Sequence, residues 1–266
     1  MRKVFILITL LFGYSSYSLL EARAETQNDP NISELNKSSQ YTGSWHNIWY
    51  LYNSDPVNAK KIKLSDKFLS HDFIVPINNP GHYDYVKTEL KDSTMASSFD
   101  GKEVDIFGVN YFDQCYFSNE NIQCDSNQGA GSKKTCMYGG ITLNENNTNN
   151  RIQPIVVKVY ENDSVTLSFD INIDKETVTI QELDYKVRNK LISKINLYHL
   201  GGTSYETGYI KFIENGNRYY WYDMMPDPGF TQSKYLMIYR GNETVESAKT
   251  EIEVHLTKSR HRATYQ

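Results

Sequence analysis

The strongest structural signal in this 266-residue sequence is one long helix with strands on both sides of it. The segment TIQELDYKVRNKLISKINLY (179–198) opens with Thr179 and Glu182, which predict a capping box. Strand-like runs precede it, with a hairpin at Asn162-Asp163, and follow it, with a hairpin at Asn215-Gly216. One apolar stripe recurs along the helix at three- and four-residue steps: Ile180, Leu183, Val187, Leu191 and Ile195. The pattern predicts an α+β domain with the helix on one sheet face.

The residues before this helix predict a second unit made of short strands. Between Ile62 and Gly140, apolar runs alternate with turn chemistry such as Asp100-Gly101. Several strands at this spacing, with few helices, predict a small barrel. The run Asn144–Asn150, almost all Asn, Glu and Thr, is the best internal boundary. Ahead of the barrel we expect helical pieces, with Asp29 before Pro30 as a helix start.

Residues 1–24 predict a secretory signal peptide. Arg2 and Lys3 precede the apolar run Val4–Phe12, and Ala22-Arg23-Ala24 supplies small residues before a cut. The apolar run is too short to span a bilayer comfortably. We therefore expect a secreted protein that starts at Glu25 and does not insert into a membrane. Asn-x-Ser/Thr sequons, such as those at Asn31 and Asn242, indicate surface-like polarity.

All three cysteines fall in one polar segment, CYFSNENIQCDSNQGAGSKKTCMYGG. Because export permits disulfides, one bond is expected, and spacing alone allows any pair among Cys115, Cys124 and Cys136. Cys115 and Cys136 each adjoin an aromatic, strand-like stretch, whereas Cys124 lies between them in the polar middle. We therefore favour Cys115–Cys136, with Cys124 as a free thiol.

Neither catalysis nor nucleic-acid binding is indicated. The formal net charge of −4 disfavours nucleic acid, which attracts a basic face. The histidines are isolated, and the sequence has no zinc-protease motif, phosphate loop or nucleophile elbow. Phe68-Leu69 is a different kind of candidate, since adjacent residues of a strand cannot both point inward. One of the pair could be exposed by chance, or it could anchor a partner's pocket.

Two long stretches resemble the bacterial superantigens, the staphylococcal enterotoxins and streptococcal pyrogenic exotoxins. YGGITLNENN (138–147) fits one family signature, and KETVTIQELDYKVRNKLISKINLY (175–198), with Asp184, Arg188 and Leu191, fits the other. The likeness is greatest to the subgroup with enterotoxins B and C and pyrogenic exotoxin A. It implies an N-terminal OB-fold β-barrel and a C-terminal β-grasp domain with a long central helix. The expected division is as follows: a helical segment at 25–54 that packs on the C-terminal domain, the barrel at 55–145, the β-grasp domain at 146–258 and a tail at 259–266.

The resemblance also implies a function by binding, not catalysis. Superantigens bridge the MHC class II α chain to the T-cell receptor β chain. By matching motifs, the expected MHC-binding residues are Phe68, Leu69, Glu89, Tyr111, Gln114 and Tyr138. The expected receptor-binding residues are Asn47, His82, Phe112, Leu200 and Gln232. The resemblance likewise implies the Cys115–Cys136 disulfide.

Zinc is disfavoured, so no cofactor is expected. Relatives with a zinc site near the disulfide loop have two histidines where this sequence has Asn144 and Thr148, which leaves Asp105 without those partners. A second family zinc site needs His and Asp on the last strand, where this chain has Glu251, Glu253 and His255. The rival function is a superantigen-like protein of the same fold that binds glycans, antibody or complement.

Overall fold

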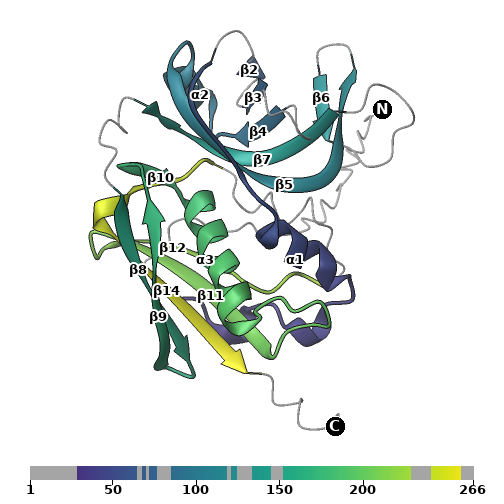
Figure 1. Ribbon diagram of the computed structural model, residues 1–266, viewed down its shortest axis with the longest axis vertical. Helices are drawn as coiled ribbons and strands as arrows, with labels where there is room; N and C mark the ends of the chain where they lie inside the picture. Colours follow the sequence, from purple (N-terminus) through teal and green to yellow (C-terminus); the bar gives the residue numbers. More distant parts are fainter. Residues whose placement is uncertain are drawn as a thin grey trace, which may run out of the picture.

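The computed structural model describes residues 29–64, 68–69, 72–76, 85–118, 121–124, 134–144, 152–228 and 241–258. Figure 1 shows a curved sheet stacked on a second sheet, with one long helix running down from the junction between them. The predicted signal peptide, the predicted boundary at residue 146 and the predicted tail lie outside the described residues. Among the residues that are described, no helix is long and apolar enough to cross a membrane.

The first sheet is built on two long, curved strands, β5 (Glu103–Ser118) and β7 (Lys134–Leu143), which pair antiparallel. The other strands are β1 (Val57–Lys63), β2 (Phe68–Leu69), β3 (Asp72–Pro76), β4 (Tyr85–Glu89) and β6 (Asn121–Cys124). Their order is β1-β5-β7-β4-β3-β2, with β6 beside β5. No pairing among the described strands joins β1 to β2, so these strands do not close the sheet into the barrel that the sequence predicted.

A short helix that the sequence analysis missed, α2 (Ser93–Phe99), lies over this sheet. It is N-capped by Asp92, whose carboxylate accepts the Met95 backbone N–H at 2.8 Å. Ala96 and Phe99 enter a small core with residues of β1, β5 and β7.

The second sheet has the order β12-β11-β14-β8-β9. Its strands are β8 (Gln153–Glu161), β9 (Ser164–Ile173), β11 (Tyr205–Glu214), β12 (Arg218–Asp223) and β14 (Thr250–Lys258). A separate ladder pairs β10 (Thr177–Thr179) with β13 (Thr244–Glu246). Both predicted hairpin turns are confirmed, because Asn162, Asp163, Asn215 and Gly216 all have positive φ.

The predicted helix is α3 (Ile180–Ile195), which covers one face of this sheet. Its stripe is buried as expected, except that Ile195 is only half-buried. One of the two hydrogen bonds of the predicted capping box is present. Thr179 accepts the Glu182 backbone N–H at 3.2 Å, but the Glu182 carboxylate turns instead to Lys175 at 2.8 Å and Lys186 at 2.9 Å. Asn196 ends the helix in the left-handed conformation.

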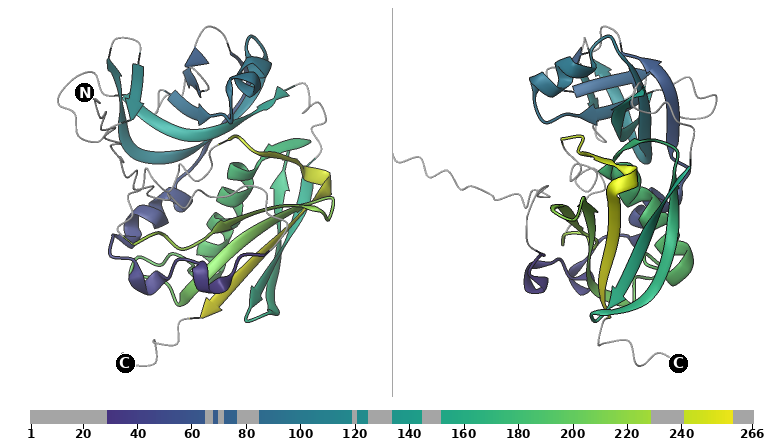
Figure 2. Two further views of the ribbon diagram at one scale, coloured as in Figure 1. Left: turned by 180° about the vertical axis from the view of Figure 1, so that it is seen from behind. Right: turned by 90° about the vertical axis from the view of Figure 1, so that its left-hand side faces the viewer.

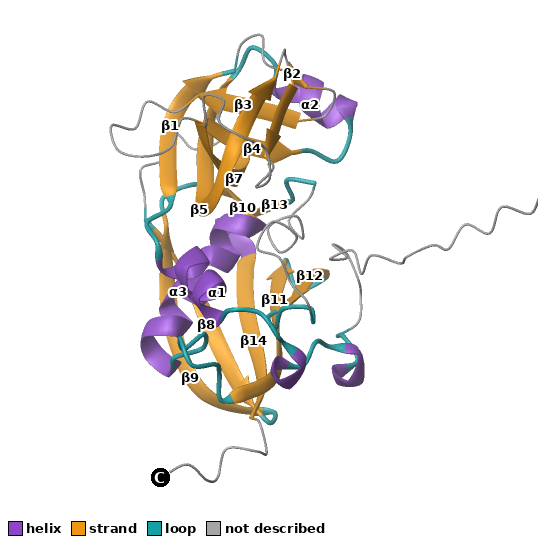
Figure 3. Ribbon diagram, turned by 90° about the vertical axis from the view of Figure 1, so that its right-hand side faces the viewer, coloured by secondary structure: helices purple, strands orange, loops and turns teal. Residues whose placement is uncertain are grey.

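The N-terminal segment packs on this second unit. It forms two 3-10 turns, η1 (Ile32–Glu34) and η2 (Ser38–Gln40), before helix α1 (Trp45–Asn53). Asp29 starts no helix, because the first cap is Asn31, which accepts the Ser33 backbone N–H. Figure 3 shows α1 beside α3, and the buried residues of α1, Ile48, Leu51 and Tyr52, join the large core beneath the β-grasp sheet.

The two units meet through direct contacts. Phe107 of β5 lies in the large core and packs its ring 5.5 Å from that of Tyr185 on α3. Lys60 of β1 forms an ion pair with Asp174, which follows β9. Asn242, just before β13, hydrogen-bonds the backbone of Ile141 in β7. It is 2% exposed, so the surface-like polarity expected of its sequon is wrong.

Gly140 lies at this junction and has no room for a side chain. A β-carbon there would stand 2.7 Å from Thr179 Cγ2 and 2.9 Å from Asn242 Oδ1. Thr179 is fixed by its capping bond and Asn242 by its bonds to Ile141, so neither can move aside freely. The Tyr-Gly-Gly signature thus has a packing reason.

We predict that Gly140→Ala lowers the free energy of unfolding by about 1–3 kcal/mol, the usual cost of overpacking. Chemical denaturation of the purified variant measures it. Gly201→Ala is the matched control, because its β-carbon would meet nothing nearer than His199 Nδ1 at 3.4 Å. Equal stability of the two variants would contradict the packing account.

Candidate functional site

The structure gathers the predicted MHC-binding residues on neighbouring strands of the first sheet. Leu69 of β2 is opposite Asp72 of β3, which is in turn opposite Glu89 of β4. Tyr138 of β7 is opposite Lys87, two residues from Glu89. Phe68, Leu69, Glu89 and Tyr138 therefore come from adjacent strands of one sheet region, although the chain separates them widely.

Tyr111, Phe112 and Gln114 fall where the pairing of β5 with β7 changes register, between Asn110 and Gln114. Such irregularities bend a strand and often occur beside functional sites. Phe112 is a predicted receptor residue, whereas Tyr111 and Gln114 are predicted MHC residues. This irregular stretch therefore contains residues of both predicted sets.

Of the receptor-side residues that are described, Asn47 and Leu200 lie on the second unit, whereas Phe112 lies on β5 of the first. Asn47 is exposed on α1, and Leu200 is 43% exposed in the turn after α3. Trp45 stacks on Tyr198 with ring centroids 6.4 Å apart, so the start of α1 lies against the end of α3. The helix that carries Asn47 therefore packs against the segment that leads from α3 to Leu200. His82 and Gln232 lie outside the described residues.

A buried arginine, whose role the sequence analysis did not identify, holds α1 and α3 together. Arg188 is fully buried, and its Nε lies 2.7 and 2.8 Å from the two carboxylate oxygens of Asp184. The guanidinium also bonds the Tyr198 hydroxyl and the Met224 carbonyl, and it lies 5.1 Å from the ring centre of Tyr52 on α1. An i, i+4 charge pair inside an apolar stripe was the available signal for such a network.

The segment leading into α1 is tied to β12 through a half-buried carboxylate. Asp223 accepts the Asn36 backbone N–H at 2.6 Å and the Met225 N–H at 2.8 Å. Asn36 also donates its side-chain amide to the Met225 carbonyl. Burial raises the pKa of Asp223 to about 7, even though these bonds favour its charged form.

The two places considered for zinc do not supply a suitable set of ligands. Asp105 is buried, and its Oδ1 accepts the Lys61 backbone N–H at 3.1 Å and the Asn144 side-chain amide at 2.7 Å. The Asn144 amide N–H therefore occupies a lone pair of Asp105 Oδ1 that a metal ion would need. Thr148 lies outside the described residues. Within the described part of the chain, no three His, Cys, Asp or Glu residues are grouped to hold a metal ion.

On the last strand, aromatic rings enclose the candidate ligand. His255 is stacked between Tyr160 and Tyr209, with both ring centroids 4.6 Å away. Its Nε2 lies 3.3 Å from Glu253, while Glu251 is 4.0 Å from Lys158. This face therefore offers a paired His and Glu, and not a three-ligand centre.

The backbone register brings both possible disulfide partners close to Cys115. Cys124 of β6 is directly opposite it, and Lys134, two residues before Cys136, is opposite it on β7. Directly opposite positions have Cα atoms about 4.5–5.5 Å apart and diagonal ones about 7–8 Å. The Cys115–Cys136 bond therefore stays a prediction, with Cys124 as a structural competitor.

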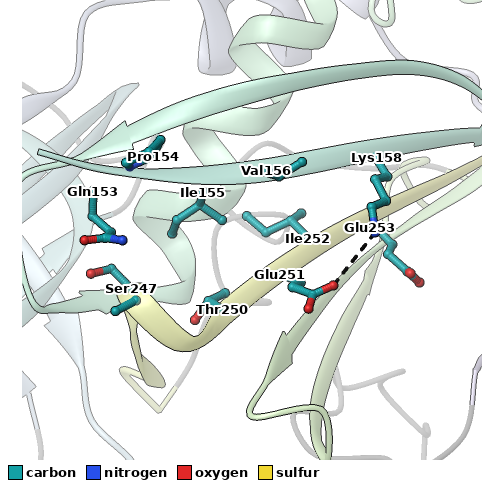
Figure 4. Close-up of a pocket in the computed structure, with 11 residues that line it drawn as sticks. Gln153, Pro154, Ile155, Val156, Lys158, Ser247, Thr250, Glu251, Ile252 and Glu253 are labelled. Carbon is teal, nitrogen blue, oxygen red and sulfur yellow. Dashed lines mark ion pairs between the residues drawn. The ribbon is translucent and has the colours of Figure 1, made fainter.

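A groove of about 310 Å³ lies between β8 and β14, near the end of these strands that precedes their first paired residues. Figure 4 shows Ile155, Val156 and Ile252 along it, with the Lys158–Glu251 ion pair near one end. None of the predicted binding residues lines this groove.

Two family models match most of the chain. The Staphylococcal/Streptococcal toxin OB-fold domain matches residues 47–143, and the Staphylococcal/Streptococcal toxin beta-grasp domain matches residues 153–256. The chain belongs to this toxin family. The predicted resemblance and the predicted fold classes are thereby confirmed.

Individual relatives agree with this assignment. Enterotoxin type C-3 of Staphylococcus aureus is 48% identical over 96% of this chain and 96% of its own. Exotoxin type A of Streptococcus pyogenes phage T12 is 44% identical, again over 96% of both.

Solved structures of the family match in three dimensions as well. One is the structure of a T cell receptor beta chain complexed with superantigen SpeA and soaked with zinc. The matching chain in it has 46% identity and a TM-score of 0.76, over 87% of this chain and 100% of that chain. A structure concerned with a zinc-binding site in streptococcal pyrogenic exotoxin A matches with 45% identity and a TM-score of 0.76, over 86% of this chain and 100% of that chain. Zinc thus occurs with relatives, whereas the described part of this chain has no group of three His, Cys, Asp or Glu residues that could hold a metal ion.

We predict that Asp223 makes stability depend on pH. Its folded pKa, about 7, lies above its ordinary value of 3.8, so its neutral form stabilises the fold fully below pH 4, and this stabilisation is lost as pH rises through 7. Between pH 4 and pH 8 the wild type should therefore lose about 2–4 kcal/mol of folding stability relative to Asp223→Asn.

Denaturant titrations at each pH measure this difference. Asp170→Asn, at an exposed position of β9, is the control for the removal of a carboxylate as such. A flat Asp223→Asn difference would show that Asp223 titrates normally in the folded protein.

Proposed function

We propose that this protein is a secreted superantigen that cross-links the MHC class II α chain to the T-cell receptor β chain, activating T cells without regard to antigen. The observation that supports the proposal is that the predicted MHC residues come from one unit, whereas the described receptor residues come from both. A bridge needs two separate surfaces. The relative SpeA, which has been solved with a T cell receptor beta chain, supports the receptor half.

The MHC surface comprises Phe68, Leu69, Glu89, Tyr111, Gln114 and Tyr138, all on strands of the OB-fold sheet. Adjacent strands place short, separated sequence stretches side by side, so an apolar anchor can be ringed by polar and aromatic residues. Anchors of this kind supply most of the binding energy in many interfaces.

The receptor surface comprises Asn47, His82, Phe112, Leu200 and Gln232. Asn47 and Leu200 lie on the β-grasp side, and Phe112 lies on β5 of the OB-fold sheet. The receptor surface is therefore composite, whereas the MHC surface belongs to one unit. Modest affinity on each side suffices, because binding between two cells gains from multivalency.

The remaining parts of the proposal follow from chemistry. The activity is binding and not catalysis. Neither zinc candidate has a fitting ligand set, so both partners are bound without a metal. The signal peptide at 1–24 directs export. The domain division is that expected from the sequence, with units at 25–54, 55–145 and 146–258.

The rival is a superantigen-like protein of the same fold that binds glycans, antibody or complement. Fold alone cannot separate the two, since function lies in the residues placed on it. The Phe68-Leu69 pair favours the superantigen.

We predict that Leu69→Ala weakens binding to soluble MHC class II by about 30-fold, since burial of one leucine contributes about 2 kcal/mol. Surface plasmon resonance with and without chelator measures it, and chelator should change neither protein's affinity. Leu200→Ala is the matched control, because this leucine lies on the receptor side and should leave MHC binding unchanged.

Each other outcome is informative. If the wild type fails to bind MHC class II, the superantigen function is wrong and the superantigen-like rival gains. If binding is lost only with chelator, the metal-free mechanism is wrong.

We further predict that peptide mapping under non-reducing conditions finds a Cys115–Cys136 bond and an alkylated Cys124. A bond closing a loop of about 20 residues stabilises by roughly 3 kcal/mol, so Cys136→Ser should lower stability by that amount while Cys124→Ser should not. A Cys115–Cys124 bond in the mapping would overturn this pairing.

A further inference from the structure

Asn242 joins the two units by an unusual contact. Its Oδ1 accepts the Ile141 backbone N–H at 2.8 Å, and its Nδ2 donates to the Ile141 carbonyl at 2.9 Å. One side-chain amide thus satisfies both backbone groups of a residue in β7. This is the pair of bonds that a neighbouring strand would otherwise make.

The position along β7 explains why such a substitute is needed. The described pairing of β4 with β7 runs only from Tyr85↔Cys136 to Lys87↔Tyr138. Ile141 lies beyond it, with β5 on its other side opposite Ile106. Gly241 bridges Leu90 just after β4, so the chain at 241–242 lies beside the sheet where β4 ends. Asn242 of the β-grasp unit therefore takes the place of a neighbouring strand at Ile141 of the OB-fold sheet.

The backbone around Asn242 is shaped and anchored for this contact. Gly241 and Asn242 have φ of 102° and 53°, in the left-handed region that favours Gly and Asn. The next residue, Glu243, accepts the Ile180 backbone N–H at 2.9 Å, at the first turn of α3. The contact therefore runs from β7 through Asn242 to the start of the central helix.

Other contacts between the units lie beside this one. Phe107, which packs on Tyr185, is directly opposite Gly140, one residue from the Ile141–Asn242 bonds. Lys60, which pairs with Asp174, follows Ala59, and Ala59 is opposite Ile106 on β5. The Ile141–Asn242 contact is thus at the β7 end of a row of contacts across β1, β5 and β7. It adds two hydrogen bonds from one side chain to one strand residue, and because hydrogen bonds are directional, it constrains orientation as well as distance.

We propose that Asn242 is a positioning residue that fixes the angle between the OB-fold and β-grasp units, and through it the composite receptor surface. The receptor half of this inference rests on the proposed function. Because receptor residues come from both units and MHC residues from one, loss of Asn242 weakens receptor binding and spares MHC binding.

Asn242→Asp provides the sharpest test, because it keeps the shape and changes only the donor. The ionised carboxylate still accepts the Ile141 N–H but faces the Ile141 carbonyl without a proton. Protonation restores an O–H donor in the same place, so lowering the pH from 7.5 to 4.5 should restore the contact. Asn215→Asp is the matched control, since Asn215 has the same φ of 53° in an exposed turn.

The first readout is the distance between spin labels at Thr94 on α2 and Ser168 on β9, in a Cys124→Ser background. In Asn242→Asp the distribution should broaden at pH 7.5 and narrow again at pH 4.5. It should stay narrow in Asn215→Asp and for a Ser168–Lys190 pair within the β-grasp unit. An unbroadened Thr94–Ser168 distance, or broadening that low pH does not reverse, would overturn the positioning role.

The second readout is binding at pH 7.5. Asn242→Asp should weaken receptor binding about tenfold and change MHC class II binding less than twofold. Equal loss for both partners would show general damage and overturn the proposal. If the wild type binds neither partner while the distance still responds to pH, the proposed function fails and the positioning role stands.

Discussion

A single buried guanidinium fixes the arrangement on which the rest of the structure depends. Arg188 lies fully buried between α3, the end of β12 and α1, with Asp184 as its charged partner. Removing one member of a buried ion pair commonly costs 3–5 kcal/mol, because the other charge stays buried without compensation. Here the loss would also leave the Met224 carbonyl and the Tyr198 hydroxyl without this donor. The place of α1, and so of Asn47, follows from that network.

The molecule divides its work between two sheets. The OB-fold sheet carries the proposed MHC surface on neighbouring strands, and the β-grasp unit with α1 carries most of the described residues of the proposed receptor surface. The register shift of β5 between Asn110 and Gln114 contains residues proposed for both. Because Gly140, Thr179 and Asn242 are packed against one another at the junction, the two surfaces hold a defined relation. A bridging protein requires that relation, since both partners must fit at once.

Local patterns predicted what local physics decides. The stripe of α3 and the two Asn-containing turns could be found in the sequence, because helix period and positive φ depend on neighbouring residues alone. Tertiary contacts decided the rest. The Glu182 carboxylate forms ion pairs with two lysines and not the second bond of the predicted capping box. Asn242 is buried because it contacts a strand about a hundred residues away in the chain. For the candidate site, motif matching named Leu69 and Glu89, but only strand register could show that they lie near each other.

The central claim is that one molecule holds both partners at the same time. The most direct measurement is sequential surface plasmon resonance, in which immobilised MHC class II captures the protein and the receptor β chain is then injected. The account predicts that the receptor binds the captured protein with a stoichiometry of about one to one, and that Asn47→Ala abolishes only this second step. Receptor that cannot bind the captured protein, or that displaces it from MHC class II, would contradict the account.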